Sequence, residues 1–441
     1  MEQELTKMIE RAFKALRAKS EPYKTYTKYY DGDQPLIYTA ERLKDAFDHP
    51  SVRFVQNWCA VVIDSVLDRL TFKGWDISDK TMDKIVDEFY LQSNMQKLSG
   101  DVHKNALVTS ESFVVFDQIE NDLRAFYNDS RMVHLFYDDN NPNKKTLGAK
   151  WWVDQDKKTT RLNIYTPELI YKLEAKDKTP GSEKAFTLMQ PEEKNPFGEI
   201  PIIHYRTGYS ELDNVILIQD AINKLFSDMM VVGEFNAFPM RYAVTNADLN
   251  ILKNSPKTIA QIPKGVEGEE NTQLGQFAAA DLDKFLNAMD KLANSIAVIT
   301  RTPKHYFHDV GGQISGEALI VMESPLIKKI KQIQENYAVG WQDCARFILK
   351  QSGREIQPSG VVCTWDPIET VQPLTKAQEI RQYVDMGVPL ETMLRRSGWA
   401  VDEIKQMRSD QVEAKKAQAS IAKATLELLR LQDARTNGAD E

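Results

Sequence analysis

The chain contains little cysteine. Its three cysteines, Cys59, Cys344 and Cys363, stand far apart in 441 residues and form no CxxC pair. A disulfide framework or a structural zinc site is therefore not expected, since both need closely patterned ligands. The pattern is typical of reduced thiols in a cytosolic product.

Long uninterrupted apolar runs are also missing. The most apolar stretch, residues 212–235, includes Asp213, Asp220, Lys224 and Asp228, so it is not expected to span a bilayer. The first residues, MEQELTKMIERAFKALR, predict a charged amphipathic helix. They are not expected to be a signal peptide, because they have neither an apolar segment nor a small-residue cleavage site. No membrane partner is expected.

Positive charge is not in excess, because the formal net charge is −8. Proteins that hold duplex DNA tightly usually carry a basic stripe, since neutralising phosphates drives their affinity. Here the lysines are scattered, and the densest groups are Lys328, Lys329 and Lys331, then Lys415 and Lys416. Tight duplex binding is disfavoured, whereas loose and transient contact with DNA stays open.

Catalytic motifs are absent as well. The sequence has no GxxxxGK[ST], GxSxG, HExxH or EF-hand pattern. His305, His308 and Asp309 form the only histidine cluster, and no further ligand nearby completes a metal site of three or four groups. We therefore expect no catalytic residue, no metal and no cofactor.

The most informative feature that is present is a pair of apolar helical runs, Leu212–Phe235 and Leu282–Ile299, on either side of an insert. Ser210 is placed to cap the first run by accepting from the amide of Asp213, and Asp281 is placed to cap the second. The first run leaves almost no continuous polar face. A helix that is apolar on most sides must be covered on most sides. Other subunits are a plausible cover, which favours a ring-forming component over a lone enzyme.

Before this pair, residues 1–206 predict one α+β domain. Helices are expected over 1–20, Arg53–Leu70 and Asp101–Thr109. The tyrosines at 23, 26, 29 and 30 are interpreted as a packing stripe more than a stacking platform. Strands are expected over 112–116, 132–137, 151–153, 162–165, 169–173 and 185–188, in an antiparallel sheet that closes with Pro201–Tyr205.

The insert 240–280 predicts strands over 241–244, 258–262 and 273–277, a short helix over 246–254 and an acidic turn over 265–271. A loop over 303–315 leads to a long helix over 316–350, in which Pro325 should produce a kink. A strand over 360–365 follows. The tail 374–437 is expected to be helical, with breaks at 387–389 and 398–399.

Short segments stand in a characteristic order along residues 29–349. They are YYDG (29–32), QPL (34–36), VVIDSVLDRL (61–70), HKNALV (103–108), IIHYR (202–206), GYSEL (208–212), QDAINK (219–224), DMMV (228–231), FPMR (238–241), TRTPKHYF (300–307), SGEAL (315–319) and MESPL (322–326). The last three are the most specific. This ordered series resembles the portal proteins of tailed bacteriophages, in particular the group found in many siphophages.

The resemblance implies an α+β portal fold. Residues 1–209, completed by 350–373, would form an α+β wing, and residues 210–239 and 281–302 would be two stem helices. Residues 240–280 would be a small α/β clip and 303–315 the tunnel loop. Residues 316–349 would form a long kinked wing helix and 374–441 an all-helical crown.

The resemblance also implies a function and its partners. The chain would form a homo-oligomeric ring of twelve subunits at the portal vertex of the capsid in the virion, after assembly in the host cytoplasm. Double-stranded DNA would pass through the ring without sequence preference, packaged by the large subunit of a separate terminase and later ejected. A head-completion adaptor, the major capsid protein and a scaffolding protein would be further partners. No enzymatic activity is implied.

Three groups of residues would carry these roles. The tunnel loop would place Lys304, His305, Tyr306, Phe307, His308 and Gln313 at the DNA channel. The stem interface would use Leu212, Ile216, Ile222, Phe226, Met230, Phe285, Met289 and Ile296. The clip would bind partners through Arg241, Lys264, Glu267, Glu269 and Glu270.

Two alternatives stay open. One is a virion scaffold or adaptor protein other than a portal, which would bind partners through the helix over 402–435. The other is a metal-dependent hydrolase that uses His305, His308 and Asp309.

Overall fold

The computed structural model describes residues 2–34, 55–120, 122–237, 241–244, 273–276, 280–307, 316–368, 373–396, 404, 406–416 and 418. The chain divides into two compact units, Met1–Ile368 and Glu369–Glu441. Within the described ranges, no helix combines the length and the apolar character that crossing a membrane requires. The strand pairs of the described part are all antiparallel, which confirms the predicted α+β class.

The first helix, α1 (Glu2–Asp31), is much longer than the helix predicted over 1–20. It continues through Pro22 and includes the four tyrosines that were expected to follow it. Tertiary contacts explain the extension: Tyr29 donates to Asp220 at 2.7 Å and Tyr30 donates to Asp64 at 2.9 Å. Tyr29 is buried in the largest core, and Tyr26 and Tyr30 pack against it, which confirms the predicted packing role for these three tyrosines.

Three helices come before and after the first strand in the chain. They are α3 (Trp58–Leu67), α4 (Lys80–Gln92) and α5 (Met95–Thr109). Helix α3 begins later than the predicted Arg53, at Trp58, where the side chain of Asn57 caps it by accepting from the amide of Ala60. Residues 53 and 54 lie outside the described part. Helix α5 confirms the prediction for Asp101–Thr109.

A three-stranded sheet has the order β10-β2-β3. Its strands are β2 (Glu111–Ile119), β3 (Asp122–Asn128) and β10 (Ile202–Arg206). The prediction that the 201–205 strand closes the larger sheet is wrong, since β10 pairs with β2. Strand β10 is buried on both faces: Ile203 and Tyr205 join the largest core, and Ile202 joins a separate cluster with Phe113.

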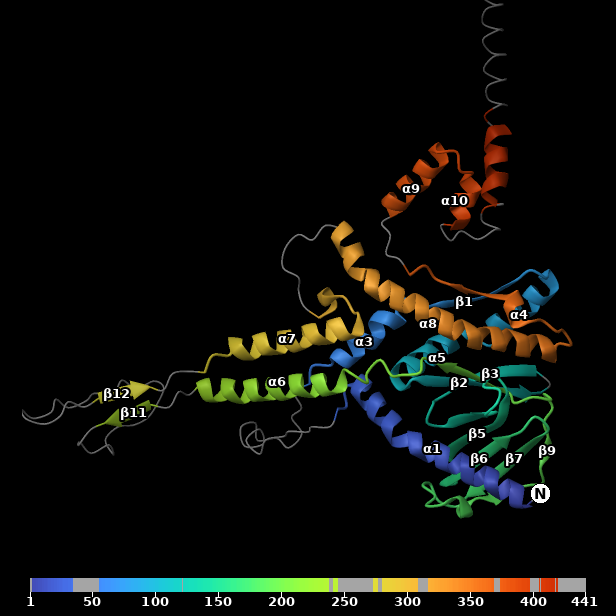
Figure 1. Cartoon of the computed structure of the whole chain (residues 1–441), viewed down its shortest axis with the longest axis horizontal. Helices are drawn as coiled ribbons and strands as arrows, with labels where there is room; N and C mark the ends of the chain where they lie inside the picture. The colour runs from blue at the N-terminus through green and yellow to red at the C-terminus, as the bar shows by residue number, and fades with distance from the viewer. Residues whose placement is uncertain are drawn as a thin grey trace, which may run out of the picture. The chain divides into compact units, whose positions relative to one another are not determined.

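The larger sheet has the order β4-β5-β6-β7-β8, and β9 also pairs with β7. Its strands are β4 (Val133–Tyr137), β5 (Lys145–Asp154), β6 (Thr159–Tyr165), β7 (Leu169–Ala175), β8 (Thr187–Leu188) and β9 (Glu193–Lys194). The predicted strand 185–188 is shortened by a 3-10 turn, η1 (Glu183–Ala185). Helix α1 lies along this sheet and buries Ala12, Phe13 and Leu16 with it (Figure 1).

The chain returns late to its first half. Strand β13 (Val361–Trp365), preceded by the 3-10 turn η4 (Pro358–Gly360), pairs with β1 (Phe72–Ile77). In this register Trp75 lies opposite Cys363. The strand at residues 361–365 therefore forms a two-stranded sheet with a strand from the N-terminal half of the chain.

The long helix α8 (Gly316–Gln351) contains Pro325, as predicted, and its first turns lie at an angle to the rest in Figure 1. Its C-terminal half forms the centre of the largest core. The ring of Trp341 stacks on Phe72 with centroids 4.5 Å apart, and its indole donates to His103 at 3.0 Å. A Cβ at Gly340 would lie 2.7 Å from the ring of Tyr205, so glycine there permits the close approach of α8 to β10.

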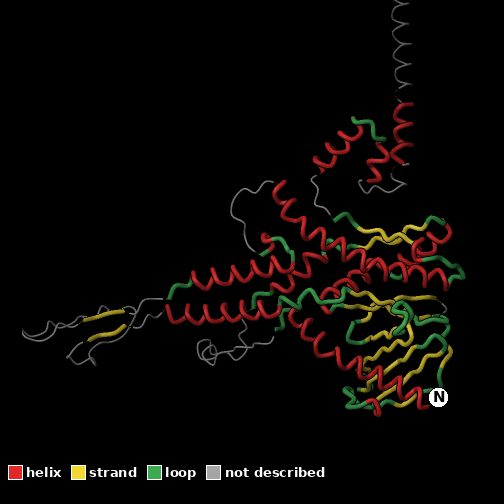
Figure 2. The backbone as a smooth tube through the Cα atoms, viewed as in Figure 1, coloured by secondary structure: helices red, strands yellow, loops and turns green. Residues whose placement is uncertain are grey.

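Two antiparallel helices, α6 (Ile216–Ala237) and α7 (Asp283–Thr300), lie side by side (Figure 2). Between them in the chain, β11 (Arg241–Val244) pairs with β12 (Gln273–Gln276), which confirms two strands of the insert. The predicted helix 246–254 and strand 258–262 lie outside the described residues. A 3-10 turn, η3 (Lys304–Tyr306), follows α7.

The second unit is helical wherever it is described. It contains α9 (Pro373–Asp385), α10 (Leu390–Arg396) and a helical stretch over 406–416. The break predicted at 387–389 is confirmed, and Gly387 has a positive φ of 96° there. The break at 398–399 and the tail after 418 lie outside the described residues.

Candidate functional site

The candidate site is the pair α6–α7 together with the segments that attach it to the rest of the unit. One side of each helix joins the largest core, with Ile222 on α6 and Met289, Ala293 and Ile296 on α7. On α7 these residues follow the 3.6-residue period of an amphipathic helix. The helix pair is thus held by apolar packing along one side.

The start of α6 is fixed by Ser210, though not as predicted. The hydroxyl of Ser210 donates to the carbonyl of Val108 at the end of α5 and accepts from the amide of Leu212 at 3.1 Å. The amide of Asp213 donates to the carbonyl of Ser210 at 3.2 Å and not to its hydroxyl. Because this anchoring occupies residues 211–215 in a turn, the helix begins at Ile216 and not at Leu212.

A buried lysine joins the two helices at this end. The ammonium of Lys329 on α8 lies 2.5 Å from Oε2 of Glu211 and donates to the carbonyl of Thr300 at 2.9 Å. The side chains of Lys329 and Glu211 are only 8% and 5% exposed. Thr300 is the last residue of α7, where a cation also favours the helix dipole. The ammonium of Lys329 therefore links α8 to two places: the turn that precedes α6 and the last residue of α7.

The polar face of α6 is used in a network of amides. The amide of Trp58 donates to Oε1 of Gln219 at 2.9 Å, and the amide of Gln56 donates to Oδ1 of Asn223 at 3.1 Å. The side chain of Asn223 in turn donates to that of Gln34. Gln219 is fully buried, so this helix is covered on its polar face by its own chain as well as on its apolar face.

The segment after α7 is packed onto the unit. Nη2 of Arg69 donates to the hydroxyl of Tyr306 at 2.9 Å and to Oε1 of Glu323 at 3.0 Å. Nε2 of His305 lies 3.8 Å from the same carboxylate oxygen. Phe307 is buried, and its ring centroid lies 5.4 Å from that of Trp58.

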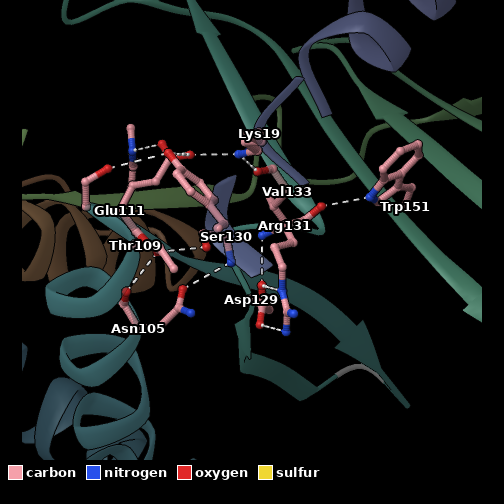
Figure 3. A network of polar contacts seen from close by, with 12 residues as sticks. Lys19, Asn105, Thr109, Glu111, Asp129, Ser130, Arg131, Val133 and Trp151 are labelled. Carbon is pink, nitrogen blue, oxygen red and sulfur yellow. Dashed lines mark hydrogen bonds and ion pairs between the residues drawn. The ribbon is translucent and has the colours of Figure 1, made fainter. Parts of the chain in front are cut away.

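A second group of buried polar residues fixes α1 to the sheets (Figure 3). Nζ of Lys19 lies 2.8 Å from Oε1 of Glu111, and Nε2 of His204 lies 2.9 Å from Oε2. Burial alone would raise the pKa of Glu111, but the hydrogen bond from His204 and the charge of Lys19 outweigh burial and lower this pKa to about 2. Burial lowers the pKa of His204, so the neutral ring donates to Glu111 and accepts from Tyr137 at 3.0 Å.

This second group is structural in character. Its Lys19–Glu111 pair extends to Thr109, Ser130 and Asn105, with the hydroxyls of Thr109 and Ser130 2.8 Å apart (Figure 3). In the described part of the chain, no three histidine, cysteine, aspartate or glutamate side chains gather as metal ligands would.

The amino-acid sequence decides the family. Residues 15–417 match the family described as phage portal protein, SPP1 Gp6-like. The chain belongs to this family of phage portal proteins.

Two curated portal proteins, from Mycobacterium phages D29 and L5, are each 25% identical to this chain over 203 residues. Each match covers 43% of this chain and 41% of the relative, so it spans about two fifths of the length of either protein.

Two solved structures with low similarity come from gene transfer agent particles. One is titled as the neck of an empty particle, with 11% identity and a TM-score of 0.47 over 78% of this chain and 88% of that chain. The other is titled as the virion of a native particle, with 10% identity and a TM-score of 0.41 over 79% and 88%. Because both scores are below 0.5, membership of the portal family rests on the sequence match.

For a portal protein, the predicted stem interface needs a correction. Four of its residues, Leu212, Ile222, Met289 and Ile296, are buried in the chain's own core and cannot form the contact surface of another subunit. Ile216, Phe226, Met230 and Phe285 are half-buried.

Other apolar side chains of the portal helix pair are exposed instead. They are Leu217 (79% exposed), Val298 (68%), Ile299 (50%) and Leu286 (46%). None of these four residues was predicted for the interface. The 3.6-residue period of α7 could have predicted that Val298 is exposed, because Val298 lies on another face of the helix than the buried Met289 and Ile296.

The predicted tunnel-loop residues are also partly corrected. The side chain of Tyr306 is only partly free to face a channel, because its hydroxyl accepts from Arg69, and Phe307 is buried against Trp58. Lys304 is exposed and His305 is half-buried. His308 and Gln313 lie outside the described residues, as does Asp309, so the hydrolase alternative stays a prediction.

Most of the predicted clip residues lie outside the described part of the chain. Arg241 lies in β11, and Lys264, Glu267, Glu269 and Glu270 lie outside the described residues. Their proposed contacts with partners stay predictions.

Proposed function

We propose that this chain is the subunit of a portal ring of twelve copies at one capsid vertex. Genomic DNA enters through the axial channel, driven by a separate terminase, and leaves by the same channel at ejection. The ring also provides the docking site for a head-completion adaptor and contacts the major capsid and scaffolding proteins during assembly in the host cytoplasm. The family match over residues 15–417 supports this assignment. The chain itself performs no catalysis in this role.

The observation that supports assembly into a ring is the set of exposed apolar side chains on the helix pair. Leu217 stands at the start of α6, and Val298 and Ile299 stand at the end of α7. Because the two helices are antiparallel, these three side chains lie at the same end of the pair. Exposed large apolar side chains that gather in one region favour a surface that is buried on association. A closed ring covers this surface in each copy and leaves no copy uncovered.

The charge balance suits a conduit. With a net charge of −8, the chain as a whole does not attract DNA phosphates. Few cation–phosphate contacts are then expected to hold the DNA and slow its passage. Lys304 lies near the start of the 303–315 segment, is exposed, and is the described residue that we assign to a weak phosphate contact. The β11–β12 strands and the rest of the 240–280 segment act as the clip that meets the terminase and the adaptor.

The test is the oligomeric state of the full chain, measured by native mass spectrometry and by negative-stain electron microscopy. The expected result is a closed ring with an axial hole. A stable monomer at micromolar concentration, at both low and high salt, would overturn the proposal. An adaptor or scaffold protein would instead give open or irregular oligomers whose formation depends on the 402–435 segment.

A further inference from the structure

A cleft of about 600 Å³ lies beside the C-terminal half of α8. Its walls come from three places that are far apart in the chain: the hairpin between β4 and β5, the end of β10 and one face of α8. The described residues that line the cleft all belong to the first unit, and none comes from α6, α7, β11 or β12. The cleft is therefore a second candidate site, separate from the helix pair and the clip.

The walls of the cleft are held in place within one chain. Asn336, Val339 and Asp343 line it from α8, where they follow one another at helical spacing. On the opposite wall, Nζ of Lys145 at the start of β5 donates to the carbonyl of Ile202 on β10 at 3.0 Å. Since both walls are fixed by the chain's own packing, the cleft is already formed before any ligand arrives.

Arg206 supplies an accessible donor in this cleft. It is the last residue of β10, it is exposed, and its guanidinium carbon lies 5.6 Å from the ring centroid of Tyr137. Among the residues that the structure describes, none accepts a hydrogen bond from this guanidinium or forms an ion pair with it. The hydroxyl of Tyr137 is fixed by its hydrogen bond to His204 at 3.0 Å. The planar N–H groups of Arg206 are therefore available for a carboxylate, which such a group binds through two parallel hydrogen bonds.

The charges of the cleft match a single negative charge. Nζ of Lys145 lies 3.7 Å from Oδ2 of Asp343, so these two charges offset each other. Burial lowers the pKa of His204, which keeps its ring neutral. The charge of Arg206 is the one left over among the residues that line the cleft. A cation is repelled by Arg206, and a doubly charged phosphate brings a second negative charge toward Asp343.

The size and the remaining side chains indicate what carries the carboxylate. A water molecule in the liquid takes a share of about 30 Å³, so a carboxylate alone fills only a small part of the cleft. The rest of the lining combines amide side chains with small apolar ones. They are Asn143 and Asn336, then Pro142, Val339 and Pro358. Amides both donate and accept, as the groups of a peptide backbone do.

We propose that this cleft binds an aspartate or glutamate side chain from a peptide segment of another protein, with its carboxylate on Arg206. The segment's backbone lies against the amides and the apolar side chains of the cleft. The inference goes beyond the proposed function, because it assigns a binding chemistry to a site that one chain forms without a ring.

The experiment measures the binding of a blocked peptide, acetyl-Gly-Ala-Glu-Ala-Gly-amide, to the full chain by saturation-transfer NMR at pH 7. The same peptide with Gln in place of Glu is the neutral comparison and is expected to bind about tenfold more weakly, the effect of one charge-assisted pair. Arg206→Gln is expected to reduce the affinity for the Glu peptide about tenfold. Arg354→Gln is the matched control, because Arg354 is exposed and is not among the residues that line the cleft, and it should stay within twofold.

Two further variants separate a binding role from a structural one. Asp343→Asn removes the negative charge in the cleft and should strengthen binding of the Glu peptide about threefold, the effect of one nearby charge screened by water. Arg206→Lys keeps the charge without the planar donor pair, so it should bind more tightly than Arg206→Gln and more weakly than the wild type.

Equal binding of the two peptides, or an Arg206→Gln variant with wild-type affinity, would overturn the inference and leave the portal proposal intact. Acetate is expected to compete with the peptide. If inorganic phosphate competed at lower concentrations than acetate, the assignment to a carboxylate would be wrong. A chain that binds the Glu peptide through Arg206 but stays monomeric would support this inference and overturn the portal proposal.

Discussion

The core around Trp341 and the helix pair α6–α7 belong to the same compact unit but bury their apolar side chains differently. Trp341, Phe72 and His103 are fully buried and hold one another by stacking and by a hydrogen bond. The helix pair buries one side through Ile222 and Ile296 and leaves Leu217 and Val298 largely exposed. The core is complete within one chain, whereas the helix pair keeps an apolar surface that a neighbour can cover.

The largest expected effect is on the core. Trp341→Ala removes a fully buried ring and its hydrogen bond to His103, so the free energy of unfolding should fall by about 4 kcal/mol. Chemical denaturation of the first unit measures this. Val339→Ala, two residues away and 63% exposed, is the control and should change the stability by less than about 0.5 kcal/mol. Equal effects of the two changes would contradict the comparison.

A somewhat smaller effect is expected at the junction between core and helix pair. Lys329→Met leaves the buried carboxylate of Glu211 without its partner and frees the carbonyl of Thr300. Breaking a buried ion pair from one side should lower the free energy of unfolding by about 3 kcal/mol. The double variant Lys329→Met with Glu211→Leu should recover part of this loss, because no uncompensated charge stays buried. A double variant that loses the sum of both single effects would contradict the assigned pair.

The free energy of unfolding should also depend on pH through a histidine in the core. Burial lowers the pKa of His103 from 6.5 to about 3, so its ring is neutral in the folded state. Below pH 6.5 the unfolded chain binds this proton and the folded chain does not. The stability is therefore complete above pH 6.5 and falls as the pH drops toward 3, by up to about 1.4 kcal/mol per pH unit from this group.

The measurement is the free energy of unfolding between pH 7 and pH 4. His103→Asn cannot take up the proton and should give a shallower dependence than the wild type. The neighbouring Lys104→Gln variant keeps His103 and should retain the wild-type slope. Identical slopes for His103→Asn and the wild type would rule out a neutral His103 as a source of the acid sensitivity.

The smallest effect on stability is expected on the exposed surface of the helix pair. Leu217→Ser and Val298→Ser should change the free energy of unfolding of the single chain by less than about 0.5 kcal/mol, because both side chains are largely exposed. Association into a ring should nevertheless weaken about tenfold or more, measured by native mass spectrometry. Leu91→Ser on α4, equally exposed, should leave association unchanged. If Leu217→Ser and Val298→Ser assembled normally, this surface would not be part of the interface between subunits.

The sequence by itself determined the features that depend on local patterns. The 3.6-residue period predicted α7 and the long helix with Pro325, and alternating residues predicted most strands of the larger sheet. The order of short segments indicated the portal family, which the match over residues 15–417 confirms. The first two signals lie in residues that are close in the chain, and the third lies in the order of segments along the chain, so none of them needs knowledge of the fold.

Only the tertiary structure decided which side chains meet across long separations. It paired β10 with β2, placed Lys329 on Glu211 and Thr300, and packed Phe307 on Trp58. It also divided the apolar residues of one helix pair, burying Ile222 and exposing Leu217. The reason is physical: hydrophobicity indicates that a side chain should be buried, and only the packed neighbours determine whether its own chain or another copy buries it.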